Sequence, residues 1–314
     1  MSKKAIIVPL IIGGVMVVLG GTIAAISAAS AGGISFLSTA EPYVERIIDV
    51  TSSTVNINVN EVNNKIVVNK SLTATEVSFS VYENTYEYYV TSETDTDFTI
   101  DYHNDIPWNK KIFYFPSNSR AMTITIPENY QGSLDINTTN AVIDVNDLSV
   151  DGEINLESVN GLISVDNTSA NGKIVVHTTN SKIELQNVTT SNNISATSMN
   201  AYIRLEDINA ADITVQTTNG KIAAEDISSN NMSLTTTNGQ ITVTDIDVAQ
   251  ETRLITTNGE VRGDVKGPST DYDVDSQTTN GTNNLAGYNA QVPSTGDKLL
   301  YVRSYNGAIN ITFK

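Results

Sequence analysis

One short pattern returns every 19 or 20 residues through the C-terminal part of the chain and then twice more at looser spacing. Each unit carries an Asn that is preceded two residues earlier by Ser or Thr and followed at once by Gly, Ala or Ser. The recurring asparagines are Asn140, Asn160, Asn180, Asn200, Asn219, Asn238, Asn258, Asn280 and Asn306. A period of this size is typical of solenoids, in which every unit stacks on its neighbours.

Apolar residues alternate with polar ones on both sides of each Asn. In one unit Ile213 and Val215 precede Asn219, and Ile222 and Ala224 follow it. Alternation with a period of two predicts a half-buried β-strand on each side of a turn. We therefore expect an all-β fold in the repeat.

Two all-β folds fit such a repeat, an antiparallel meander of hairpins and a parallel β-solenoid. A two-residue hairpin turn needs positive φ at both central residues, which Ala141, Ser181 and Ala201 would resist. A turn that needs left-handed backbone only at the Asn tolerates them. Stacking would also align the asparagines in a ladder of amides. The sequence thus favours a parallel β-solenoid of about nine coils.

The repeat divides the chain into four predicted regions: a membrane anchor at 1–31, a linker at 32–51, a β-rich cap at 52–127 and the solenoid at 128–314. The cap holds seven strand-like runs, Thr54–Asn60, Lys65–Lys70, Glu76–Tyr82, Tyr86–Thr91, Phe98–Tyr102, Ile112–Phe115 and Met122–Ile126.

Both ends of the stack need a cover, because a solenoid coil is stable only between neighbours or under a cap. The pair of runs around Asn63 is interpreted as a degenerate coil, and Leu300–Phe313 is predicted to close the core at the far end.

The predicted anchor is an uncharged run of 27 residues, Ala5–Ala31, preceded by Lys3 and Lys4. As a helix it would be roughly 40 Å long, more than the bilayer core needs. Cleavage after Ala29-Ser30-Ala31 is the alternative, but the apolar part of a signal peptide has only about 7 to 15 residues. The two lysines place the N-terminus inside and the remainder of a single-pass protein outside the cytoplasm.

Charge and composition exclude several functions. The chain has 18 Lys and Arg against 35 Asp and Glu, a net charge of -17, so we expect no nucleic-acid partner. It has no Cys for thiol chemistry and only two His, with no nucleophile motif beside them. A carbohydrate-active β-helix enzyme would need acids and cations on one outward strand face, for which only Lys182 with Glu184 and Arg204 with Glu206 are candidates. We predict no enzyme and no organic cofactor.

A second column of residues lies seven positions after the turn asparagines: Asp147, Asn167, Asn187, Asp207, Asp226 and Asp245, called the Asx column below. Stacked carboxylates of Asp207, Asp226 and Asp245 would repel one another, and a Ca²⁺ ion would relieve that repulsion. The alternative, which we favour, is that each Asx side chain caps its own turn.

Aromatic residues gather in the predicted cap, where packing in a core is their ordinary role. Trp108, the single tryptophan, lies between Pro107 and Asn109 and is the best candidate for an exposed contact with a partner.

The turns "SVNG" (Ser158–Gly161) and "TTNG" (Thr217–Gly220), the "ITIP" segment (Ile124–Pro127) and one N-terminal span together resemble the putative-adhesin family of prokaryotic cell-surface proteins. The resemblance implies a β-solenoid with no established catalytic motif. From the predicted export, the rigid repeat and the lack of a catalytic cluster we expect a membrane-tethered surface protein, adhesin-like or structural, whose partners are surface glycans, other surface proteins or further copies of itself. An envelope-stress or regulatory accessory and a carbohydrate-active enzyme are the alternatives.

Overall fold

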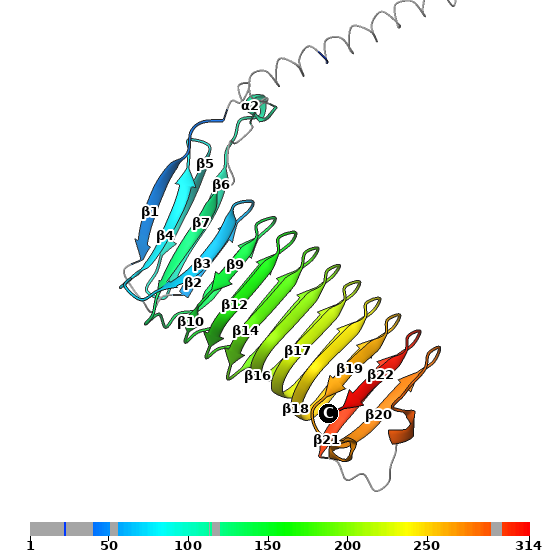
Figure 1. Ribbon diagram of the computed structural model, residues 1–314. Coiled ribbons are helices and arrows are strands. Elements are labelled where there is room, and N and C mark those ends of the chain that lie inside the picture. Colours follow the sequence, from blue (N-terminus) through cyan, green and yellow to red (C-terminus); the bar gives the residue numbers. More distant parts are fainter. Residues whose placement is uncertain (1–21, 23–39, 51–55, 113, 115–119, 290–296) are drawn as a thin grey trace, which may run out of the picture.

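The computed structural model describes residue 22 and residues 40–50, 56–112, 114, 120–289 and 297–314. These residues are mostly β-strand, joined in one large and largely parallel sheet system (Figure 1). Within the described residues no helix is long and apolar enough to cross a membrane. The predicted anchor at 1–31 lies outside them apart from Thr22.

Each coil of the repeat contributes one strand before the Asn turn and one after it. The strands before the turn, the pre-turn row, are β8 (Leu134–Thr138), β11 (Ile154–Ser158), β13 (Ile174–Thr178) and β15 (Asn193–Ser198). Those after it, the post-turn row, are β9 (Ile143–Asn146), β12 (Ile163–Ala170) and β14 (Ile183–Thr190), with the short β10 (Ser149–Val150) beside β12. Further along, β16 (Ile203–Thr217), β17 (Ile222–Thr236) and β18 (Ile241–Thr256) bend through both rows.

Successive coils pair in parallel and in register, so equivalent residues lie beside one another. Ile154 pairs with Ile174 in the pre-turn row, and Ile163 pairs with Ile183 in the post-turn row. The parallel, solenoid-like arrangement predicted from the turn residues is confirmed, and the antiparallel meander is wrong for the repeat.

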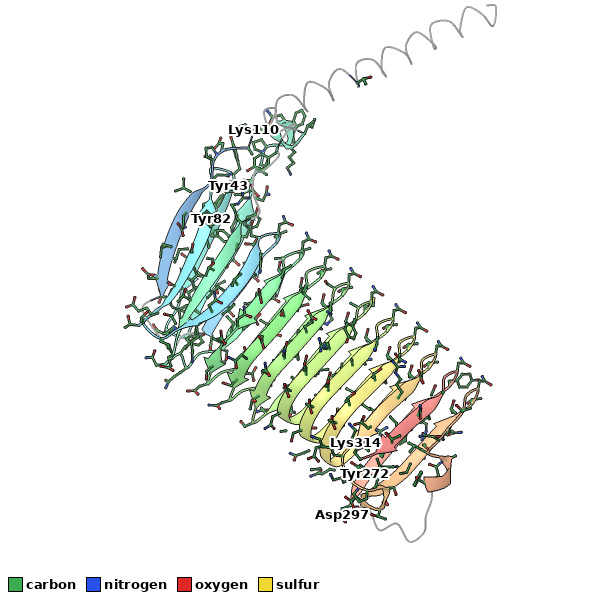
Figure 2. The ribbon with its side chains drawn as sticks, viewed as in Figure 1. Tyr43, Tyr82, Lys110, Tyr272, Asp297 and Lys314 are labelled. Atoms are coloured by element: carbon green, nitrogen blue, oxygen red, sulfur yellow. The ribbon has the colours of Figure 1, made fainter. Side chains whose placement is uncertain are left out.

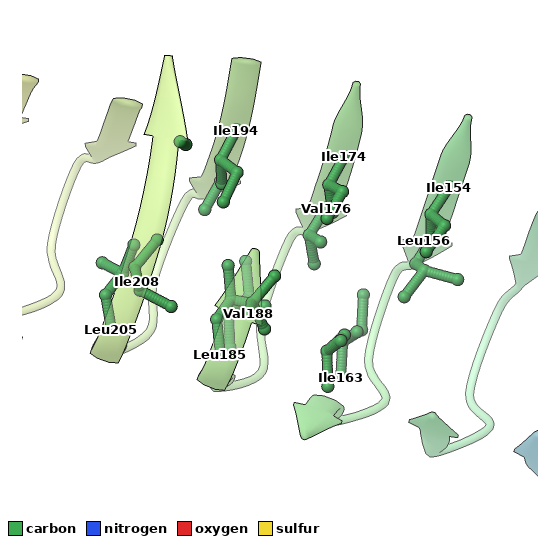
Figure 3. Close-up of a cluster of buried hydrophobic side chains, with 14 of the residues drawn as sticks. Ile154, Leu156, Ile163, Ile174, Val176, Leu185, Val188, Ile194, Leu205 and Ile208 are labelled. Atoms are coloured by element: carbon green, nitrogen blue, oxygen red, sulfur yellow. The ribbon is translucent and has the colours of Figure 1, made fainter. Parts of the chain in front are cut away.

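The core lies between the two rows. Ile213, Val215, Ile222 and Ala224 are each at most 2% exposed, as their alternation predicts. Figure 3 shows the same pattern in neighbouring coils, where Ile154 and Leu156 lie beside Ile174 and Val176. Each buried aliphatic contributes about 1.5 to 3 kcal/mol, which a coil gains in full only when another coil or a cap covers it.

The first coil is formed by β2 (Asn56–Glu61) and β3 (Lys65–Ser71), which pair in parallel with β8 and β9. The prediction of a coil around Asn63 is confirmed, and the predicted boundary at residue 128 is therefore wrong. The cause is the turn: Glu61 stands where later coils have Ser or Thr. Its carboxylate accepts hydrogen bonds from the backbone N–H groups of Val62, Asn63 and Asn64, with lengths of 2.8 to 3.2 Å.

Beyond this coil the strand direction is kept for one more layer and then reverses. In parallel, β6 (Asp97–Asn104) adds to β2 and β7 (Ala121–Pro127) adds to β3. The antiparallel strands β5 (Glu87–Glu93) and β4 (Val77–Glu83) then cover β6 and β7. Reversed strands cannot continue the coil pattern, so they end the stack.

Two further predictions about this end are wrong. Residues 44–50 of the predicted linker form β1 (Val44–Val50), which pairs antiparallel with β4, because β4 offers it a full-length free edge. Ile112, predicted to begin a strand, instead follows the short helix α2 (Trp108–Lys111) with helical backbone, because the chain enters this turn through Pro107.

The far end of the stack does not follow sequence order. In the pre-turn row β18 pairs with β21 (Lys298–Ser304), and β20 (Tyr272–Thr278) lies outside β21 (Figure 1). In the post-turn row β19 (Val261–Val265) pairs with β22 (Ile309–Phe313). The last coil of the sequence is thus inserted beneath the preceding one, and the prediction that it closes the core is wrong.

The cover at this end is the connection after β20. It includes the turn η3 (Ala286–Tyr288), while a second turn, η2 (Ser269–Asp271), precedes β20. Leu285 is fully buried, and the ring of Tyr288 packs edge-on against Phe313 at 5.3 Å. An apolar plug therefore closes the core where no further coil follows.

Candidate functional site

The predicted turn asparagines form one continuous ladder of side-chain amides on the surface of the solenoid. Each Nδ2 donates to the Oδ1 of the Asn in the neighbouring coil at 2.7 to 2.9 Å. In spatial order the ladder runs through Asn63, Asn140, Asn160, Asn180, Asn200, Asn219, Asn238, Asn258, Asn306 and Asn280. All the amide dipoles point the same way along the stack.

A buried column of hydroxyls lies beneath this ladder, called the hydroxyl column below. Thr236 Oγ1 donates to the carbonyl of Gly220 at 3.0 Å and accepts the N–H of Gly239 at 3.1 Å. Thr256 makes the equivalent pair of bonds with Gly239 and Gly259. The hydroxyl therefore closes its own turn and ties it to the preceding coil, which explains why Ser or Thr recurs two residues before each Asn.

The small residue after each Asn lies where two coils approach most closely. A Cβ added at Gly239 would lie 1.7 Å from the carbonyl oxygen of Gly220. The sequence therefore keeps small residues at this position for reasons of stacking and not of a hairpin turn.

The expected left-handed backbone is found in a different place. Positive φ, between 48° and 55°, occurs throughout the Asx column, whereas the turn asparagines are absent from the described residues with positive φ. The prediction of left-handed turn asparagines is therefore wrong. Asn and Asp tolerate this conformation better than other residues with a side chain, which accounts for the Asx column without a ligand.

The carboxylates proposed for Ca²⁺ do stack in register, since their flanking residues pair between β16, β17 and β18. Asp245 is held by Lys314, whose Nζ lies 2.9 Å from its Oδ1 and 3.0 Å from Asp264. In the part of the chain that the structure describes, no group of three or more His, Cys, Asp or Glu is arranged to hold a metal ion.

The two charged pairs singled out in the sequence lie together on the post-turn row. Arg204 Nη2 lies 2.7 Å from Glu206, and Lys182 contacts Glu184. Glu184, Arg204 and Glu206 line a shallow hollow of about 170 Å³ together with Ser164 and Asp166. Both carboxylates are paired with a cation two residues away on a solvent-facing strand. The hollow is suited to weak binding of a polar group.

A carboxylate surrounded by tyrosines lies in the cap, where the described chain begins. Glu87 is only 8% exposed, and its carboxylate accepts hydrogen bonds from the hydroxyls of Tyr43, Tyr102 and Tyr114. Burial acts to raise the pKa of Glu87, but these hydrogen bonds and the charge of Arg120 outweigh it and hold the pKa below its usual value of 4.5. Glu87 thereby fastens residue 43 to the cap.

Trp108, predicted as an exposed contact, has 82% of its surface exposed and begins α2. Ile112, one turn later, is 68% exposed. Figure 2 shows Lys110 of this helix at the same end of the molecule as Tyr43, and Tyr272 and Lys314 at the opposite end.

The Toastrack DUF4097 family model matches residues 46–312, from β1 to the last strand. The chain belongs to this family. The match covers the cap and the coils together, so the toastrack domain includes both.

Several solved structures are similar to this toastrack chain. A putative lipid binding protein from Parabacteroides distasonis is 12% identical over 86% of this chain and 97% of that one, with a TM-score of 0.48. Putative adhesins from P. distasonis and P. merdae give 11% and 12% identity over 88% and 86% of this chain and 98% and 96% of theirs, with TM-scores of 0.47 and 0.44. A search of curated proteins finds no match. Structural similarities with such low sequence identities and TM-scores say nothing about the ligands of this chain.

Sequence reasoning missed the tyrosine cluster of the toastrack cap. Tyr43, Glu87 and Tyr114 are far apart in the chain and share no motif. The one available signal was Glu87 itself, an acidic residue two positions before Tyr89 in a strand-like run, and the structure buries both side chains.

The backbone role of the Asx column predicts a distinct response to substitution. Asp226→Asn is expected to leave the free energy of unfolding unchanged, whereas Asp226→Ala is expected to lower it by about 1 kcal/mol, because Ala resists φ near 51°. Urea unfolding followed by circular dichroism measures both, with Glu225→Ala on the same strand as control. If Asp226→Asn or a chelator destabilises the protein, the result supports a Ca²⁺ site in the Asx column instead.

Because its pKa is lowered in the folded protein, Glu87 is predicted to make the stability of the protein depend on pH. A carboxyl whose pKa falls on folding stabilises the protein above its unfolded value and loses this contribution as the pH drops through the lowered one. Glu87→Gln is therefore expected to lower the unfolding temperature at neutral pH and to match the parent chain well below pH 4.5. Exposed Glu225→Gln serves as control. A difference in unfolding temperature that is the same at every pH would show that the ionisation of Glu87 does not contribute to stability.

Proposed function

We propose that this chain is a membrane-tethered protein whose solenoid stands outside the cytoplasm and makes non-catalytic contacts, in adhesion or in assembly of the cell surface. One observation carries the proposal: the Asn ladder runs unbroken from the first coil to the last. It supports a rod that keeps its two ends roughly 40 Å apart at about 4.8 Å per coil. In the sequence, the apolar run of residues 5–31 precedes the strands of that rod.

A rod of this kind is suited to contact through its side faces. Outward residues on each row repeat at the spacing of the coils, as in the column that pairs Glu157, His177 and Thr197. Such columns offer many weak, evenly spaced polar contacts to an extended partner such as a surface glycan, another surface protein or a second rod.

Intact cells that make the full chain with a C-terminal epitope tag provide the test. We expect an impermeant antibody to label the tag, and cell-surface crosslinking to capture glycan or surface-protein partners. Replacing residues 5–31 with a cleavable secretion signal should release the tagged protein into the medium. A tag reached only after the cells are lysed would refute the tether, and surface labelling without any captured partner or binding to glycan arrays would refute the contact role.

The hollow beside Arg204 favours a carbohydrate-active enzyme as the second candidate. Glu184, Glu206 and the guanidinium lie on one face, the arrangement that sequence reasoning required of such an enzyme. Incubation of the protein with a panel of acidic and neutral polysaccharides would release oligosaccharides if this alternative holds. Arg204→Ala should then abolish the release without changing stability.

A further inference from the structure

The end of the cap carries an apolar patch with a basic neighbour, which we call the tip. It consists of Trp108 and Ile112, which are 82% and 68% exposed, and of the exposed Lys111. Residues four apart on a helical turn lie on the same face, so the two apolar side chains form one surface.

The tip is fastened to the place where the described chain begins. Lys110 Nζ lies 3.7 Å from Glu41 Oε1, and the hydroxyls of Tyr43 and Tyr114 are 3.1 Å apart. Ala40 lies only nine positions after Ala31, the last residue of the apolar run. Nine residues span at most roughly 30 Å, so a membrane that holds the run lies within reach of the tip.

From this placement we infer that the tip docks on the same bilayer, with Trp108 and Ile112 in the headgroup region and Lys111 facing anionic lipid. The inference rests on the proposed tether and adds a second point of attachment. Trp and Lys are the residues that favour this interface. The chain as a whole has a net charge of -17, so anionic lipid repels the body of the rod and selects the basic tip. Two attachments would fix the angle at which the rod leaves the membrane.

Trp108 is the only tryptophan, so its fluorescence reports on the tip alone. The full chain is reconstituted into vesicles of phosphatidylcholine and phosphatidylglycerol, with or without brominated phosphatidylcholine. Flotation with the vesicles reports the tether independently of the tip. We expect about twofold or stronger quenching by the brominated lipid and a blue-shifted emission, because the indole lies at the depth of the interface. Quenching should weaken when phosphatidylglycerol is omitted.

Substitutions distinguish docking of the tip on the bilayer from mere closeness to the bilayer that the tether alone would cause. Ile112→Asp and Lys111→Glu should each reduce the quenching while flotation is unchanged. In the double variant Trp108→Phe with Met199→Trp, the reporter sits at an exposed turn on the side of the rod and should not be quenched. A chain that floats while Trp108 stays unquenched overturns the tip contact and leaves the tether intact. A chain that does not float overturns the tether and, with it, the docking that depends on it.

Discussion

Thr236→Val is expected to lower the free energy of unfolding by about 2 to 4 kcal/mol, although it changes no more than a hydroxyl to a methyl group. The hydroxyl donates to Gly220 and accepts from Gly239, and Thr236 is only 2% exposed. Without it a buried carbonyl and a buried N–H lose their partner, and each unsatisfied group costs about 1 to 3 kcal/mol. Urea unfolding monitored by circular dichroism measures the loss.

The ladder above the hydroxyl column should matter less. Asn238→Ala removes two amide bonds of 2.7 Å, but the Asn ladder is exposed and water replaces its lost partners. We expect a loss of about 1 kcal/mol or less. Thr237→Val, at an exposed position of the same turn, is the matched control and should change little. A loss for Asn238→Ala as large as that for Thr236→Val would show that the ladder, and not the hydroxyl column, holds the coils together.

The coils could be predicted from sequence because all their determinants are local and repeated. Thr217, Asn219 and Gly220 each meet an equivalent residue in the coils on either side, a hydroxyl, an Asn and a small residue respectively, so one unit of the pattern specifies the stacking of the rest. The alternation around them fixes which side chains enter the core. For the same reason the coil around Asn63 was recognisable despite Glu61 in the hydroxyl position.

The order of the last coils could not be predicted in this way. Every coil presents nearly the same pairing edge, so the pattern does not decide whether Asn258 is followed in space by Asn280 or by Asn306. What decides it is the connection after β20, whose Leu285 fills the end of the core. A single apolar residue in an irregular segment carries no periodic signal.

The candidate contact residues also differ in whether the sequence alone could predict them. The exposure of Trp108 follows from its place next to Pro107 in a segment without alternation, and could be anticipated. The cluster around Glu87 depends on side chains from separate parts of the chain, and so does the approach of Glu41 to Lys110. Contacts of that kind are fixed by how the cap folds and not by a spacing in the sequence.

The two ends of the stack are closed by different means. At the N-terminal end antiparallel strands cover the rows, whereas at the far end single backbone bridges at Asn283 and Asn289 and two side-chain amides take the place of a further strand. Asn289 accepts the N–H of Ser276 at 2.8 Å and donates to its carbonyl at 2.7 Å, on β20. Asn284 accepts the N–H of Ile311 at 3.0 Å and donates to its carbonyl at 2.7 Å, on β22. Each amide occupies the donor and acceptor of an edge strand that another chain would otherwise pair with.

Removing both amides is therefore expected to convert the far end into a docking edge. In the double variant Asn284→Leu with Asn289→Leu, the edges of β20 and β22 keep their length but lose these partners. We expect the weight-average mass in sedimentation velocity to rise at least about twofold over that of the parent chain as the concentration increases, since free parallel edges pair end to end. Far-UV circular dichroism checks that the coils remain folded.

Asn310→Leu provides the matched control, because it adds an apolar side chain of the same size at an exposed position of β22 without touching a backbone partner. It should leave the mass unchanged. Equal association of this control would assign the effect to added apolar surface and not to the uncapped edge. If the double variant neither associates nor loses its last coil to limited proteolysis, the amides are dispensable, and the apolar plug around Leu285 alone is what ends the stack.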